Sequence, residues 1–169
     1  MRTVKLFLCI CLMTISVGLY AQDEEQSIEV VRHFVQDFYN WYAPLVLKTD
    51  TDIAWERLLK EKPLVLDSNL IHLIGNDYRE QAKAKGVIVG IDFDPFLNSQ
   101  DPSATYVAGK VSGNENVFRV EVRERRSDGG ADNAELVAEV SRINGKWRFT
   151  NFYYGKNRDL VSILKAQKY

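Results

Sequence analysis

The spacing of apolar residues changes once along this chain, near Gly86, and this change limits the folds that the chain can adopt. Before Gly86, apolar side chains recur every three or four residues, as in amphipathic helices. After it, they alternate with polar side chains, as in strands that bury one face. Helices followed by consecutive strands predict an α+β domain with the helices packed on one face of a curved antiparallel sheet.

Three helices are predicted before the change. The first covers residues 27–48, with Ser27 as its cap and Pro44 as a kink or end. A shorter one runs from residue 50 to 59. The third starts at Asp67 and Ser68, a plausible cap, and runs toward Ala82.

Four strands and a last helix are predicted after the change. Asn144-Gly145 is a strong hairpin signal, and the Gly-rich residues 126–133 predict a second hairpin loop. Asn157 is the expected cap of a short final helix. The strands are expected at residues 104–111, 118–123, 135–143 and 146–154.

The first 21 residues are typical of a secretory signal peptide. Arg2 and Lys5 precede an apolar run, and the small residue Ala21 precedes a polar stretch. We therefore expect cleavage after Ala21, export to the periplasm or medium, and a single domain over residues 22–169. An uncleaved membrane anchor is the alternative, but the apolar run is short for a span of roughly 20 residues.

The mature chain lacks the chemistry of several protein classes. Both cysteines, Cys9 and Cys11, lie in the signal, so disulfides, thiolate nucleophiles and thiolate metal sites are excluded after cleavage. Loss of Arg2 and Lys5 leaves 20 basic and 23 acidic residues, a net charge of −3. Such a chain lacks the basic character expected of a nucleic-acid binder. No apolar stretch after Ala21 is long enough to span a membrane.

The stretch "GIDFDPFLNSQD", residues 90–101, is the densest in polar and aromatic residues. Its aspartates, Asp92, Asp94 and Asp101, could form a loose calcium site, although the EF-hand spacing fails. Two of them could act as a catalytic acid and base. The interpretation we favour is a structured connection in which Phe93 and Phe96 anchor the loop and the aspartates bond to backbone N–H groups or to Arg148.

Aromatic residues crowd the first helix in "FYNWY", residues 38–42. Helical geometry puts Phe38, Trp41 and Tyr42 on the core side and turns Tyr39 elsewhere. Core packing is the simplest explanation, and an aromatic wall of a ligand pocket is the alternative.

Three segments together resemble a known family: "FVQDFYNWY", "DFDPFLNSQD" and "GKWRFTNFYY". They are similar to a family of small exported bacterial proteins, a domain of unknown function related in fold to the nuclear transport factor two-like (cystatin-like) superfamily. The resemblance implies a sheet wrapped into a cone around the first helix, with a cavity at its mouth. It brings no catalytic residues, because the family has no established activity.

The sequence thus predicts an exported, non-catalytic binding domain without a cofactor or metal. Its partner would be a small molecule, a peptide or another protein, and a homodimer is a further alternative. The expected pocket rim consists of Tyr39, Trp41, Tyr42, Asp92, Asp94 and Asp101. Two rival hypotheses are an acid–base enzyme of the ketosteroid-isomerase or dehydratase kind, using one of these aspartates, and an inhibitor or immunity-type protein.

Overall fold

The computed structural model describes residues 3–49, 51–84, 89–125 and 136–167, with side chains from residue 25 onward apart from those of residues 51 and 52. The mixed α+β composition predicted from the sequence is confirmed, because helices come first, a four-stranded antiparallel sheet follows, and a short helix ends the described chain. The elements are α1 (Thr3–Val46), α2 (Thr51–Glu61), α3 (Ser68–Lys83), β1 (Tyr106–Asn114), β2 (Val117–Glu124), β3 (Leu136–Ile143), β4 (Lys146–Tyr153) and α4 (Leu160–Ala166).

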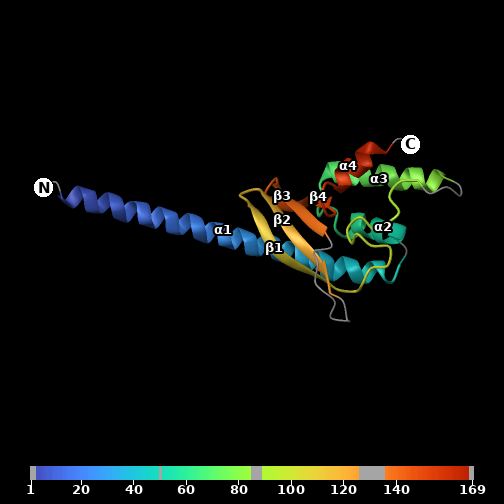
Figure 1. Ribbon diagram of the computed structural model, residues 1–169, viewed down its shortest axis with the longest axis horizontal. Helices are drawn as coiled ribbons and strands as arrows, with labels where there is room; N and C mark the ends of the chain where they lie inside the picture. The colour runs from blue at the N-terminus through green and yellow to red at the C-terminus, as the bar shows by residue number, and fades with distance from the viewer. Residues whose placement is uncertain (1–2, 50, 85–88, 126–135, 168–169) are drawn as a thin grey trace.

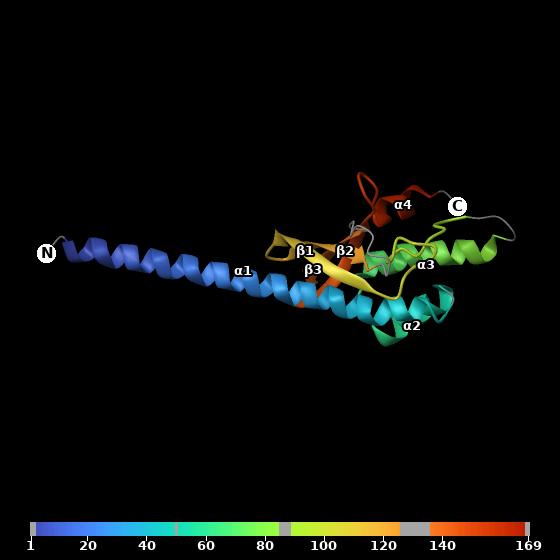
Figure 2. The same ribbon diagram turned by 60° about the horizontal axis from the view of Figure 1, so that its bottom comes forward.

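Helix α1 runs along the sheet and extends well past it at the N-terminal end (Figure 1). Helices α2, α3 and α4 gather at the opposite end of the sheet, and a turned view shows α1 along one side of the strands (Figure 2). The expected cleavage point after Ala21 lies within α1. Among the described residues, no helix combines the length and the apolar character needed to cross a bilayer.

The sheet has the strand order β1-β2-β3-β4, so each strand pairs with its neighbour in sequence. The Asn144-Gly145 hairpin is confirmed: both residues have positive φ, 51° and 76°, and they join β3 to β4. Two bulges interrupt the pairing. In β1, Gly109 and Lys110 together lie opposite the single residue Glu121, and in β4 Thr150 is the extra residue. Bulges of this kind bend and twist a strand.

The core lies between the inner face of the sheet and the C-terminal half of α1. Phe38 of α1 lies with its ring centroid 4.8 Å from that of Phe149 in β4 and 5.8 Å from that of Phe96. Phe149 and Trp147 of β4 both pack against the core, but only Phe149 is fully buried; Trp147 is half-buried against Phe118.

Tyr39 corrects the expectation for the first helix. The helical wheel turned this side chain away from the core, but it is only 1% exposed. It stacks on Tyr106 of β1, with ring centroids 5.6 Å apart, and its hydroxyl reaches the loop at Phe96. Because α1 buries side chains against both the sheet and that loop, its buried arc is wider than a single apolar stripe.

Both outer strands of the sheet are covered. The amide of Gln36 accepts from the N–H of Ala108 at 2.9 Å and donates to the carbonyl of Tyr106 at 3.0 Å, so α1 pairs with the edge of β1. On β4, Phe149 exchanges backbone hydrogen bonds with Val65 and Asp67. An uncovered edge would offer a template for pairing with other chains.

Helix boundaries follow the sequence only in part. Asp67 caps α3 as predicted, accepting from the N–H of Leu70 at 2.7 Å. The cap of α4 is Asp159 and not Asn157, which has a φ of 63° in the preceding turn. Ser27 caps nothing, because α1 continues through it, and Pro44 lies inside α1 two residues before its end. The predicted loop at residues 126–133 and the change in periodicity at Gly86 lie outside the described residues.

Candidate functional site

The loop of residues 90–101 folds around a tight turn that begins at Asp94. The N–H of Asp94 donates to the carbonyl of Ser99, and the Asp94 carbonyl accepts from the N–H of Asn98 at 2.9 Å. Asn98 takes a φ of 51°, a conformation that asparagine tolerates better than most residues. The turn is therefore closed by its own backbone, as the structural interpretation of this loop predicts.

Asp94 is the buried centre of the turn, only 4% exposed. One carboxylate oxygen accepts from the N–H groups of Phe96 and Leu97, at 2.9 and 3.0 Å. The other accepts from the hydroxyl of Tyr42 at 2.8 Å. The sequence named backbone N–H groups and Arg148 as alternatives for this role, and the hydrogen bonds come from the backbone and from a tyrosine.

Burial raises the pKa of Asp94 to about 6, because it removes water from the charged form. The hydrogen bonds from Tyr42, Phe96 and Leu97 lower the pKa, but they offset only part of the rise that burial causes. Asp94 thus combines burial and a raised pKa, as expected of a catalytic aspartate, with hydrogen bonds from backbone N–H groups, as expected of a structural one. The hydrogen bonds favour a structural role, since three donors already occupy the two oxygens and hold the carboxylate in place.

Three tyrosine hydroxyls fix the turn from different elements. Tyr42 of α1 donates to the Asp94 carboxylate, and Tyr39 of α1 donates to the carbonyl of Phe96 at 2.8 Å. Tyr154, which follows β4, donates to the carbonyl of Pro95 at 2.6 Å. Each of these phenols is buried. A buried hydroxyl normally has a partner, and here each partner is on the same three-residue segment.

The start of the loop is fixed to α3. Asp77 is fully buried and accepts from the side-chain amide of Gln81 at 2.6 Å and from the N–H of Ile91 at 3.3 Å. Gly90 has a φ of 80°, and a Cβ at this position would lie 2.4 Å from an Asp77 carboxylate oxygen. Glycine is required here by both the backbone conformation and the close approach of Asp77.

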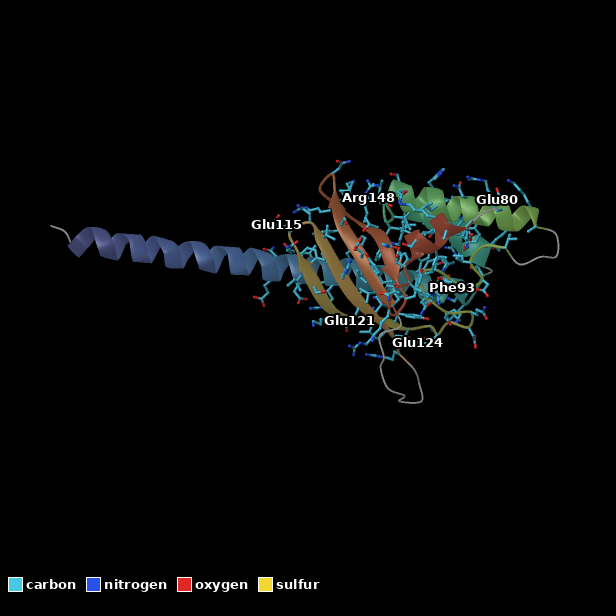
Figure 3. The ribbon with its side chains drawn as sticks, turned by 45° about the horizontal axis from the view of Figure 1, so that its top comes forward. Glu80, Phe93, Glu115, Glu121, Glu124 and Arg148 are labelled. Carbon is cyan, nitrogen blue, oxygen red and sulfur yellow. The ribbon has the colours of Figure 1, made fainter. Side chains whose placement is uncertain are left out.

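A cavity of about 370 Å³ opens between this loop, α3 and the end of α1. Figure 3 shows Phe93 on the loop at the end of the sheet where α3 lies, far from Glu115 at the β1–β2 turn. Cavities of roughly 300–1,000 Å³ are typical of small-molecule sites. The walls are formed by Val46, Tyr78, Gln81, Ile91, Asp92, Phe93, Asp94, Ser99, Gln100 and Pro102.

Only two of the six residues expected at a pocket rim line this cavity, Asp92 and Asp94. Asp92 is exposed and accepts from the amide of Gln100, whereas Asp94 is buried, so the two carboxylates do not point to the same side. Asp101 is exposed on the same loop and lies outside the cavity walls.

The three aromatic candidates of α1 do not line the cavity. Tyr39 and Tyr42 are buried behind the loop and act on it through their hydroxyls. Trp41 is half-buried on another side, where the Lys62 ammonium lies 5.1 Å from its ring centroid.

The cavity residues of α3 were missed by the sequence interpretation. Tyr78 and Gln81 are three positions apart and therefore lie on the same face of the helix. Asp77 and Gln81, four positions apart in an otherwise amphipathic helix, were the available indication that polar groups face the protein interior. No role was predicted for Gln100, which also lines the cavity.

Two other hollows border the described residues. One, of about 440 Å³, lies beside Val30, Arg142 and Trp147, and the other, of about 250 Å³, beside Lys110, Arg123 and Arg125. Their described walls come from α1 and the strands or from Arg125, the residue after β2, and include no residue of the loop 90–101. Within the part of the chain that is described, no three His, Cys, Asp or Glu residues lie close enough together to hold a metal ion.

Comparison with protein-family models, with curated proteins and with solved structures finds no match to this chain.

Proposed function

We propose that this protein is an exported binding protein without catalytic activity, and that it holds a small molecule in the cavity beside residues 90–101. One observation carries this proposal: a cavity of small-molecule size is bounded by a turn that three buried tyrosine hydroxyls hold in place. A wall that is already ordered loses little freedom when a ligand binds, which favours affinity.

Export and the cone-like fold are further parts of the proposal. The signal-like residues 1–21 support export. The packing of α1 along an antiparallel sheet supports the relationship to nuclear transport factor two-like proteins. The proposed ligand site of this protein would lie at the end of the sheet near α3.

Acid–base catalysis by Asp94 is the second candidate function. It is favoured by the position of Asp94 in the cavity wall and by its pKa of about 6, close to that of a general base. It is opposed by the three hydrogen bonds on the carboxylate, which must weaken before either oxygen can accept a proton from a substrate.

A thermal-shift screen tests the binding proposal. Amines, sugars, carboxylates, nucleosides and short peptides are added to the purified protein, and the melting temperature is measured. A ligand that binds only the folded state raises that temperature in a saturable way. We expect at least one compound to do so with the native protein and not with Val46→Trp, in which an indole fills part of the cavity.

Val117→Trp is the matched control, since Val117 is an exposed valine of β2 outside the cavity walls. This variant should respond to the same compound as the native protein. A screen without any saturable shift, or a shift that persists in Val46→Trp, would contradict the proposal.

A further inference from the structure

The cavity walls offer acceptors and few donors. The side-chain amide nitrogen of Gln81 already donates to Asp77 and to the carbonyl of Ile91, at 2.6 and 3.0 Å. That of Gln100 donates to the carbonyl and the carboxylate of Asp92, at 3.0 and 3.3 Å. Neither amide oxygen accepts a hydrogen bond from the residues that the structure describes, and an amide oxygen can only accept, so both oxygens are acceptors for a ligand.

The charge of the walls has one sign. Asp92 and Asp94 contribute two carboxyl groups, and the described lining residues include neither lysine nor arginine. Asp92 is exposed, and its carboxylate accepts from the side-chain amide of Gln100. A ligand that carried a carboxylate or phosphate would meet like charge here without a basic side chain to compensate for it, which opposes binding.

Aromatic rings complete the walls. Tyr78 stacks on Trp55, with ring centroids 5.6 Å apart, and Phe93 packs edge-on against Tyr154 at 5.3 Å. These contacts fix the orientation of the two rings that line the cavity. The faces of aromatic rings attract ammonium groups, and sites for organic cations commonly combine such rings with acceptors.

We propose, on the basis of the binding function above, that the cavity takes a small organic ammonium compound. The ammonium group donates to the Asp92 carboxylate and to the amide oxygens of Gln81 and Gln100. The apolar body of the ligand lies against Tyr78 and Phe93. A protonated amine is the one common ligand group that matches acceptors, negative charge and aromatic rings together.

Three sets of matched probes test this inference: benzylamine, benzyl alcohol and benzoate; cyclohexylmethylamine, cyclohexylmethanol and cyclohexanecarboxylate; and putrescine, 1,4-butanediol and succinate. Binding to the full protein is measured by calorimetry at pH 7. We expect at least one amine to bind about ten-fold more tightly than the alcohol of its set, since hydrogen bonds to charged groups are the stronger ones. The acids should bind most weakly.

Asp92→Asn and Asp101→Asn form a matched pair of variants. Both remove one exposed carboxylate from the same loop, but only Asp92 lines the cavity. Asp92→Asn should weaken amine binding roughly five-fold, which is the upper end of what an exposed ion pair contributes. Asp101→Asn should leave amine binding unchanged.

The outcomes separate the ligand class from the binding function. If no amine binds, if an alcohol or acid binds as tightly as its amine, or if both variants weaken the amine equally, the ammonium inference is wrong. The binding function would still stand if another compound of the thermal-shift screen bound in the cavity. If no compound bound there, both would fail.

Discussion

At the scale of single residues, Asp94 has a clear effect on stability as a function of pH. Its folded pKa of about 6 lies above the ordinary value of 3.8, because burial disfavours the charge. Between these values the folded state binds more protons than the unfolded state. This contribution to stability is therefore full below about pH 4 and is lost as the pH rises through about 6.

Asp94→Asn should remove this contribution. The amide oxygen can still accept from Phe96 and Leu97, and the side chain no longer titrates. Denaturant unfolding measured from pH 4 to 7 should show a difference in slope between native protein and variant of up to about 1.4 kcal/mol per pH unit, the value for one proton. Asp101→Asn, on the exposed part of the loop, should keep the native slope. Equal slopes for the native protein and Asp94→Asn would mean that Asp94 titrates normally.

Gly90 lies so close to Asp77 that a larger side chain should destabilise the protein. Gly90→Ala introduces a Cβ that would lie 2.4 Å from Asp77 at a φ of 80°. Gly155→Ala is the control, because Gly155 has a similar φ of 68° but no atom within 4 Å of the place that its Cβ would take. Both variants carry the backbone strain, so their difference isolates the clash. We expect Gly90→Ala to lower the free energy of unfolding by about 1–3 kcal/mol more than the control does, as for other overpacked sites. Similar losses in the two variants would show that Asp77 moves aside freely.

At the scale of elements, the Gln36 amide joins α1 to the edge of β1, beside the Arg32 guanidinium, which donates to the carbonyl of Gly109 at 3.2 Å. Gln36→Glu keeps the shape and the acceptor for Ala108, but it replaces the donor to the Tyr106 carbonyl with a second acceptor. The loss of this bond and the opposed oxygens should lower the free energy of unfolding by about 1–3 kcal/mol. Gln26→Glu makes the same chemical change at an exposed position of α1 and should cost less than about 0.5 kcal/mol. Chemical denaturation of both variants measures the difference. Equal losses in the free energy of unfolding would show that the Gln36 amide does not stabilise the contact between α1 and β1.

The order of the helices and strands could be predicted from the sequence, whereas the irregularities of the sheet could not. Periodicity, the Asp67 cap and the Asn144-Gly145 turn are local signals, and they predicted the order of helices and strands correctly. The bulge at Thr150 depends on pairing between strands and was not predicted. It allows Phe149 and Phe152 to be buried together although they are three residues apart.

The site was harder to predict because its residues come from distant segments. Asp92 and Asp94 stood out through the composition of their own loop. The burial of Tyr39 depends on a carbonyl 57 residues away, and Gln81 becomes a wall residue only because Ile91 folds back onto α3. Nothing in the sequence near either residue indicates these contacts.

At the scale of the whole molecule, we expect export to shorten the chain. Residues 1–21 are expected to be removed after Ala21, because a basic start, an apolar run and a small residue precede that point. The intact mass of protein recovered from the periplasm or medium should correspond to a chain that begins at Gln22. A mass that still includes Met1 would contradict the signal-peptide hypothesis and favour an anchor.

The tyrosines around the turn also bear on the order in which the chain folds. Tyr39 and Tyr154 meet the turn from 57 and 59 residues away, on opposite sides of it in sequence. Contacts between such distant segments form slowly, since a long loop must close first. The cavity wall is therefore completed only after α1 and the last strand have come together. Once complete, the amide hydrogens of Phe96 and Leu97 should exchange with solvent as slowly as those of the central strands, because they are released only when the whole structure opens.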